Sequence, residues 1–366
     1  MRIAINCRSF MGPRPVGIGR YAGSLVRQLA LIDSRNEYFL YCPRGLFDLR
    51  RKFPQPPAAN FFVKPDPFGW GVDFAAGHPD IYHAPSPEIL RTKVGRVIVT
   101  VHDLVFKVYP QVHTAEALRL SEQLMDSIVG RADQFICISR STAADLEKYY
   151  PSTRGKTVIV YNGIDSRIFY PISDDERSAG RDWLKKVGIL PPFLLFVGTL
   201  EPRKNLKNIF QAFAAVKRQG YFSGQLVVAG MKGWMSEGLR DDLRRMGLEK
   251  DVVFLGFVSD ENLRWLYNLT QVFLYPSFYE GFGYPVVEAM ACGAAIVTSN
   301  VSSCAEIAAT AALTVDPAIW EDMARAIRRI LEDEEMTMSL RAAALRRAAE
   351  FSPGINAQRT LAVYAG

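Results

Sequence analysis

Short apolar strands alternate with amphipathic helices along almost the whole chain, and few folds accommodate such an alternation. The clearest helical stretches of the first half are residues 19–32 and 114–130. Its candidate strands are residues 2–7, 37–42, 60–65, 80–85, 96–103, 134–139 and 157–163. Because these strands are continuous apolar runs, they fit a parallel sheet covered by helices on both faces. The pattern predicts an α/β fold with a doubly wound sheet.

The same alternation restarts after an irregular stretch at residues 165–171. Ser173 and Glu176 have the spacing of a capping box, which predicts a helix start. New strands are expected at residues 193–198, 225–229, 252–255, 272–275 and 295–298, with helices at 205–219, 261–268 and 284–291. We therefore predict two Rossmann-like domains, residues 1–165 and 166–350, facing across a cleft. Residues 351–366 are predicted to form a last helix that packs back towards the N-terminal domain.

Composition narrows the class of protein further. No apolar run approaches the ~20 residues that span a bilayer, and the start lacks the pattern of a signal peptide, so a cytoplasmic protein is expected. The five cysteines are dispersed and predict buried thiols, and the four histidines lack metal-type spacing. We expect no metal site. The net charge of +6 arises entirely within the first 165 residues and suits an anionic partner or an acidic membrane surface, although a solvated surface is equally compatible with it.

The segment from Glu280 to Glu288 carries the strongest chemical signal. It follows a predicted strand and leads into a helix that begins near Tyr284. Backbone N–H groups at such a start bind phosphates or sugar hydroxyls, and Gly281 and Gly283 allow close backbone approach. Two carboxylates at this spacing could each hold a polyol, one a sugar and the other a ribose. A lone Glu at either position would more often compensate the helix dipole or be solvated.

A second group ends the first strand of the C-terminal half. Gly198 is followed by Arg203 and Lys204, which precede a predicted helix. A guanidinium and an ammonium beside a helix start can stabilise a diphosphate leaving group without a metal ion. The chain has no Asp-x-Asp pair to hold such a metal. An isolated Arg-Lys pair is otherwise a basic surface turn.

Two further groups follow strands of the first half. His102 and Asp103 end a buried strand, where side chains face a ligand crevice. Gly17, Gly19 and Arg20 lie in a short glycine-rich loop between the first strand and the first helix. This loop is weak evidence for a phosphate site. No acidic partner follows at the distance that a dinucleotide cofactor requires.

Together these motifs resemble family 4 of the retaining glycosyltransferases, which have the GT-B fold. The segment of Glu280 and Glu288 is similar to the family's EX7E signature, although Tyr284 stands where the family commonly has Leu. The resemblance implies that Glu280 contacts the donor sugar and Glu288 the ribose, and that Arg203 and Lys204 bind the diphosphate. The resemblance further implies that Val258 contacts the nucleobase, that His102 lies near the reaction centre, and that Arg20 and Asp103 lie near the acceptor. The other residues that it implies in donor binding are Gly17, Gly19, Gly198, Gly281, Phe282 and Gly283.

The expected reaction is metal-independent transfer of a hexose, with mannose favoured, from a GDP- or UDP-sugar to a saccharide or lipid-linked acceptor. No cofactor and no nucleic-acid partner are expected. Residues 44–53 combine aromatic and basic side chains and are a candidate for peripheral contact with the inner face of a membrane, or an exposed helix. Two alternatives stay open: a nucleotide-sugar epimerase of the same fold, and a non-catalytic protein that binds nucleotide sugars. A dehydrogenase would bind NAD, which we do not expect.

Overall fold

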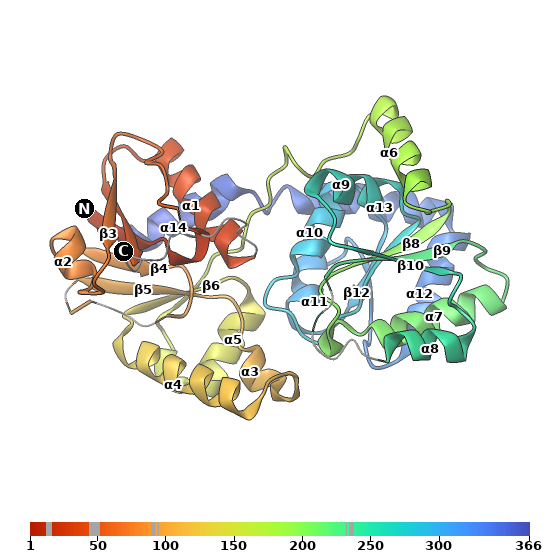
Figure 1. Ribbon diagram of the computed structural model, residues 1–366, viewed down its shortest axis with the longest axis horizontal. Coiled ribbons are helices and arrows are strands. Elements are labelled where there is room, and N and C mark those ends of the chain that lie inside the picture. Colours follow the sequence, from red (N-terminus) through yellow and green to blue (C-terminus); the bar gives the residue numbers. More distant parts are fainter. Residues whose placement is uncertain (12–16, 44–51, 89–91, 94, 232, 234–237) are drawn as a thin grey trace. The chain divides into compact units, whose positions relative to one another are not determined.

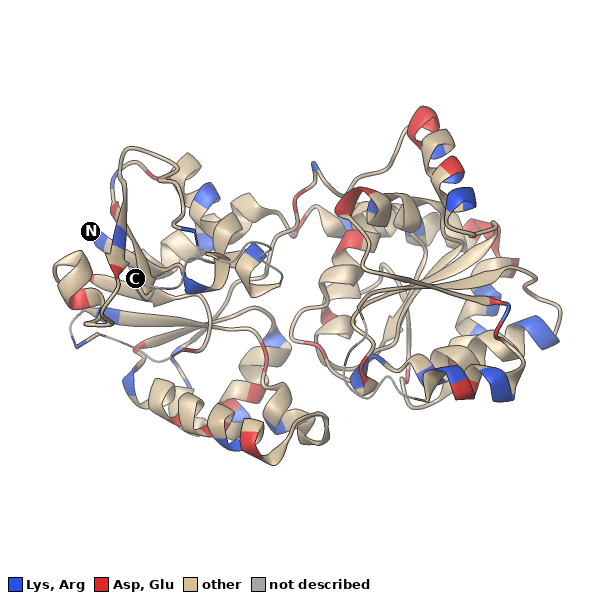
Figure 2. Cartoon of the chain, in the orientation of Figure 1, with Lys and Arg blue, Asp and Glu red and all other residues tan. Residues whose placement is uncertain are grey.

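The computed structural model describes residues 1–366 except 12–16, 44–51, 89–91, 94, 232 and 234–237 (Figure 1). The chain divides into two compact units. Unit 1 comprises Met1–Gly163 and Pro353–Gly366, and unit 2 comprises Ile164–Ser352. The described parts of both units are α/β, and lysine, arginine, aspartate and glutamate are interspersed along their helices (Figure 2).

Unit 1 is built on a parallel sheet of seven strands in the order β3-β2-β1-β4-β5-β6-β7. The strands are β1 (Arg2–Asn6), β2 (Glu37–Pro43), β3 (Phe61–Asp66), β4 (Ile81–Ala84), β5 (Arg96–Val101), β6 (Gln134–Cys137) and β7 (Thr157–Ile159). Helices α1 (Ile18–Ile32) and α14 (Pro353–Ala365) cover one face, and α4 (Ala115–Arg131) and α5 (Arg140–Tyr149) cover the other (Figure 1). Unit 1 also contains two short α-helices, α2 (Val72–Ala76) and α3 (Val105–Val108).

Helix α14 brings the end of the chain into the core of unit 1. Ala357 and Tyr364 are buried in the same cluster as Leu25 and Leu29 of α1. The Tyr364 hydroxyl lies 2.6 Å from Nδ1 of His83 on β4, in a fully buried contact. The last helix is thus part of the unit that the N-terminal residues form, although the whole of unit 2 separates them in sequence.

Unit 2 repeats the architecture with a parallel sheet of six strands in the order β10-β9-β8-β11-β12-β13. The strands are β8 (Phe193–Val197), β9 (Gln225–Ala229), β10 (Val252–Gly256), β11 (Val272–Tyr275), β12 (Ile296–Ser299) and β13 (Leu313–Val315). The helices are α6 (Asp174–Lys186), α7 (Leu206–Arg218), α8 (Leu239–Met246), α9 (Asp260–Leu269), α10 (Tyr284–Ala291), α11 (Ser302–Ala308), α12 (Trp320–Glu332) and α13 (Glu334–Ala348). The capping box predicted at Ser173 and Glu176 is present at the start of α6.

The doubly wound parallel sheets confirm the predicted fold class. Several elements were not predicted, among them the helices α2, α3, α5, α8 and α11 and the three-residue strand β13. All five cysteines are free and buried, as expected. Within the described residues, no helix is long and apolar enough to cross a membrane. Of the candidate membrane segment at residues 44–53, all but the last two residues lie outside the described residues.

Candidate active site

The loops that follow β8 and β11 meet in unit 2 because these two strands are neighbours in the sheet. The first loop forms a single turn of 3-10 helix, Pro202–Lys204, and the backbone N–H of Phe278 donates to the carbonyl of Arg203 at 2.9 Å. Asn205 adopts the left-handed conformation (φ 66°) and caps α7. Its side-chain amide donates to the carbonyls of Pro276 and Pro317. This buried amide fixes the loop that carries the two cations.

Glu280 and the two cations form one buried cluster. The Glu280 Oε1 atom lies 2.5 Å from Nζ of Lys204, and Oε2 lies 2.9 Å from a guanidinium nitrogen of Arg203. The hydroxyl of Tyr275, at the end of β11, donates to Glu280 Oε1 at 3.0 Å and lies 2.8 Å from Lys204 Nζ. Glu201 holds the other side of the Arg203 guanidinium at 2.7 Å. The structure therefore brings together three of the predicted site residues, Arg203, Lys204 and Glu280.

The electrostatics of the cluster keep its carboxylate ionised. Burial alone would raise the pKa of Glu280, but the charges of Lys204 and Arg203 lower it to about 2. Burial opposes the charged form of Arg203, yet the carboxylates of Glu280 and Glu201 raise the pKa of that guanidinium. At neutral pH the cluster is thus a carboxylate between two cations, with no proton on Glu280 to give to a leaving group.

The remaining predicted residues of unit 2 surround the start of α10. Gly283 caps this helix with a φ of 90°, a backbone conformation that L side chains rarely adopt. Glu288 lies within α10, and its Oε2 accepts a hydrogen bond from the Tyr267 hydroxyl at 2.9 Å, so it is held separately from Glu280. Phe282 is buried, Gly281 precedes it, and Gly198 directly follows β8. Val258 lies two residues beyond the end of β10.

Unit 1 holds its own set of predicted residues. His102 follows β5, and its Nε2 lies 2.7 Å from the carbonyl oxygen of Pro85. Because a carbonyl only accepts, Nε2 carries the proton, which leaves Nδ1 of the neutral ring as an acceptor. Burial lowers the pKa of His102, while the Pro85 carbonyl and Asp103 act in the opposite direction. The neutral ring packs edge-on against Tyr21 of α1, with 5.2 Å between ring centroids.

The other candidates of unit 1 lie beside the start of α1 or after β5. Gly17 caps α1 and is exposed, Gly19 is buried in its first turn, and Arg20 is exposed. Asp103 accepts a hydrogen bond from the backbone N–H of Val105 at 3.1 Å, which fixes the loop after β5.

Two residues of the cluster are not indicated by the sequence alone. Tyr275 falls within the strand predicted at residues 272–275, and Glu201 is not among the predicted site residues. Tyr275 ends β11, and Glu201 lies in the loop after β8. These positions indicate a contact with the cluster only once β8 and β11 are known to be neighbouring strands. Within the described residues, no group of His, Cys, Asp and Glu has the arrangement of a metal site.

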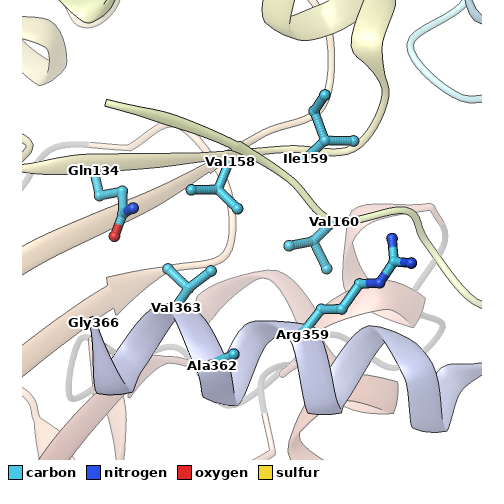
Figure 3. Close-up of a pocket in the computed structure, with 8 residues that line it drawn as sticks. All are labelled: Gln134, Val158, Ile159, Val160, Arg359, Ala362, Val363 and Gly366. Atoms are coloured by element: carbon cyan, nitrogen blue, oxygen red, sulfur yellow. The ribbon is translucent and has the colours of Figure 1, made fainter. Parts of the chain in front are cut away.

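A cavity of about 380 Å³ lies elsewhere in unit 1 (Figure 3). It lies between β7 and α14 and is lined mainly by aliphatic side chains, among them Val158, Val160 and Val363, with Arg359 beside them. None of the predicted site residues lines it.

Two family models match the chain. The model described as "Glycosyltransferase Family 4" matches residues 15–167, and the model described as "Glycosyl transferases group 1" matches residues 182–347. The chain belongs to glycosyltransferase family 4. As a member of this family, the enzyme is a hexosyltransferase by type and takes its sugar from a nucleotide sugar.

Similar proteins agree with this assignment. The glycosyltransferase is 28% identical over 361 residues to O-antigen chain mannosyltransferase B of Escherichia coli, covering 92% of each chain. Sucrose-phosphate synthase from Thermosynechococcus elongatus has a similar structure, with a TM-score of 0.78, 21% identity and coverage of 100% of this chain and 98% of that one. Anabaena HepE in complex with UDP and glucose gives a TM-score of 0.72 at 19% identity, covering 100% and 99% of the two chains. The glycosyltransferase thus has the GT-B fold.

Proposed function

We propose that this glycosyltransferase transfers a hexose, with mannose favoured, from a nucleotide diphosphate sugar to a saccharide or lipid-linked saccharide, without a metal ion. The observation that carries the proposal is the buried cluster of Arg203, Lys204 and Glu280. Two fixed cations offer a diphosphate the charge that a divalent cation would otherwise supply. The preference for mannose is supported by similarity to the O-antigen chain mannosyltransferase.

In this proposal the residues of unit 2 bind the donor. Arg203 and Lys204 stabilise the departing nucleoside diphosphate, and Glu280 accepts hydrogen bonds from hydroxyls of the sugar. Glu288 holds the ribose. Backbone groups contact the sugar, the phosphates and the base. They belong to Gly198 after β8, to Val258 after β10, and to Gly281, Phe282 and Gly283 before α10.

Residues of unit 1 complete the proposed site. His102 lies near the reaction centre, where its neutral ring positions the sugar rather than acting as a general base. Gly17 and Gly19 approach the donor phosphates, and Arg20 and Asp103 are the candidates for acceptor contacts. Exclusion of water from the site once both substrates are bound would limit donor hydrolysis.

The proposed chemistry is substitution on the front face of the sugar, with retention of configuration. The bond between the anomeric carbon and the phosphate oxygen breaks, and the bond to the acceptor oxygen forms on the same face. The acceptor proton moves to the departing phosphate oxygen. The low pKa of Glu280 supports this assignment, since a carboxylate with a pKa of about 2 neither donates a proton at neutral pH nor accepts one effectively.

We also propose that the enzyme works in the cytoplasm, in peripheral contact with the inner face of a membrane, and that nucleic acid is not a partner. A lipid-linked acceptor would be presented at that surface. The excess of basic residues in the first 165 residues supports this part of the proposal.

The test is turnover on a panel of GDP-mannose, UDP-glucose, UDP-N-acetylglucosamine and ADP-glucose in excess EDTA, with mannosylated oligosaccharides as acceptors. The expected result is release of one nucleoside diphosphate in step with formation of an α-linked product, unchanged by EDTA. Inverted product, strict dependence on a divalent cation, or epimerisation of a donor without acceptor would each overturn the proposal.

A further inference from the structure

Tyr267 is a fully buried phenol to which the proposed function assigns no role. It lies near the end of α9, and its hydroxyl donates a hydrogen bond of 2.9 Å to Oε2 of Glu288 on α10. Helices α9 and α10 are neighbours in unit 2 (Figure 1). An ionised carboxylate only accepts hydrogen bonds, so the phenol must be the donor. The carboxylate proposed to hold the ribose is therefore itself held by a residue of another helix.

The hydroxyl of Tyr267 keeps its hydrogen throughout the neutral range. Burial, and after it the charge of Glu288, raise the pKa of Tyr267 well above the ordinary value for a tyrosine. The hydrogen bond to Glu288 is consequently present whenever that side chain is a carboxylate.

The ring of Tyr267 is fixed by other buried aromatic rings. It meets Phe273 of β11 edge-on, with 5.2 Å between ring centroids and 85° between planes, and it meets Phe169 at 6.0 Å and 69°. Phe273 also stacks on Tyr275, whose hydroxyl donates to Glu280. One buried ring thus contacts both of the phenols that hold the two candidate carboxylates. Close packing of this kind leaves the Tyr267 hydroxyl little freedom to move.

The end of α9 that carries this phenol is tied to other parts of unit 2. The side-chain amide of Asn268 donates to the carbonyl of Tyr170 at 3.0 Å and accepts from the backbone N–H of Ile172 at 3.0 Å. The hydroxyl of Thr270, which caps α9, donates to the carbonyl of Phe193 at 3.0 Å. These bonds connect the helix end both to β8 and to the segment before α6.

We infer that Tyr267 is a positioning residue: it orients the Glu288 carboxylate for the two hydroxyls of a ribose and so makes the donor site selective for ribonucleotides. The inference rests on the proposed contact between Glu288 and the ribose. Tyr267 is fully buried, whereas Glu288 is half-buried, so the phenol acts through the carboxylate and not on the ligand.

The physical basis is pre-organisation of a flexible side chain. A glutamate has three side-chain torsions, and a ligand that needs one orientation of its carboxylate must otherwise restrict them on binding. A vicinal diol needs both oxygens of the carboxylate in a fixed orientation. Each carboxylate oxygen can accept two hydrogen bonds, so Oε2 can bind Tyr267 and a ribose hydroxyl together.

The test is calorimetric titration with GDP or UDP, whichever the enzyme binds, and with the 2′,3′-dideoxy form of the same nucleotide. The wild type is expected to bind the ribose form at least about tenfold more tightly, because hydrogen bonds to a charged group are lost with the two hydroxyls. Tyr267→Phe keeps the packed ring and should lower this ratio about fivefold through weaker binding of the ribose form. Its affinity for the dideoxy form should equal that of the wild type.

Two further variants separate the inference from the proposal beneath it. Glu288→Gln should lose most of the ratio, and adding Tyr267→Phe to it should lower the ratio no further. Tyr170→Phe is the matched control, because it removes a phenol that donates to Glu176 at 2.9 Å in the same unit. Its ratio should equal that of the wild type.

The possible failures are distinguishable. A wild-type ratio in Tyr267→Phe, beside a lowered ratio in Glu288→Gln, would overturn the inference and leave the ribose contact standing. An equal loss of affinity for both nucleotide forms in Tyr267→Phe would also overturn it, since a purely structural role gives that result. A wild-type ratio in Glu288→Gln would instead refute the proposed ribose contact, and the inference with it.

Discussion

At the residue scale, Glu280 is the centre of the proposed site, and its carboxylate is paired with two cations. Arg203 and Lys204 occupy both of its oxygens, and Glu201 takes the far side of Arg203. A diphosphate that enters this cluster therefore competes with carboxylates for the same cations. Replacing Glu280 should remove the competitor together with the contact to the sugar.

Glu280→Gln is accordingly expected to abolish transfer while nucleoside diphosphate binding is retained or tightened. The amide keeps the shape of the side chain but leaves Lys204 without its carboxylate and Arg203 with Glu201 alone, and a diphosphate would restore the missing negative charge. Calorimetric titration with GDP and UDP, beside an assay of transfer, measures both effects. Glu261→Gln, the same change at an exposed position on α9, is the control. Wild-type transfer by Glu280→Gln would refute the assigned role.

The same substitution should destabilise unit 2 and flatten its acid dependence. Breaking a buried ion pair by removing one partner costs about 3 kcal/mol. Because the pKa of Glu280 is about 2 in the folded chain against an ordinary 4.5, its contribution is complete above pH 4.5 and is lost as pH falls towards 2. Urea unfolding between these pH values should show a smaller decline for Glu280→Gln than for wild type. Parallel declines would contradict the charge pairing.

At the element scale, the alternation of strands and helices could be recognised from the sequence because the strands are continuous apolar runs. Periodicity missed β13, which has three residues of which only the last is buried, and α5, whose first turn is rich in serine and threonine. The motif residues could be placed at strand ends from the sequence. The cluster they form could not, since Lys204 and Glu280 are 76 residues apart and meet only because β8 and β11 are adjacent.

Helix α14 offers a test at this scale. Tyr364→Phe should lower the stability of unit 1 by about 1 kcal/mol, because His83 loses a buried hydrogen-bonding partner. Tyr364→Ala should cost about 3 kcal/mol or more, because a cavity opens between α14, α1 and the sheet. Thermal unfolding measures both.

Nucleoside diphosphate binding provides the control for these variants, since unit 2 holds the proposed donor residues and should keep its affinity. If Tyr364→Ala left thermal unfolding unchanged, the packing of α14 on unit 1 would be wrong.

At the scale of the whole molecule, the chain has two sheets. We propose that unit 2 binds the donor and that unit 1 binds the acceptor. The presence of two sheets was predictable because the α/β pattern restarts, and the family resemblance followed from a few loop residues. The identity of the acceptor was not readable. The loops proposed to contact it carry only a short glycine-rich motif, which does not specify a saccharide.

Arg203, Lys204 and Glu280 are proposed to form a nucleoside diphosphate site that needs no metal ion. Calorimetry with GDP, UDP, ADP and NAD in excess EDTA tests it most directly. We expect selective binding of one nucleoside diphosphate, no binding of NAD, and about tenfold weaker binding by Arg203→Ala. Binding that appears only when a divalent cation is restored, binding of NAD alone, or unchanged affinity in Arg203→Ala would contradict it.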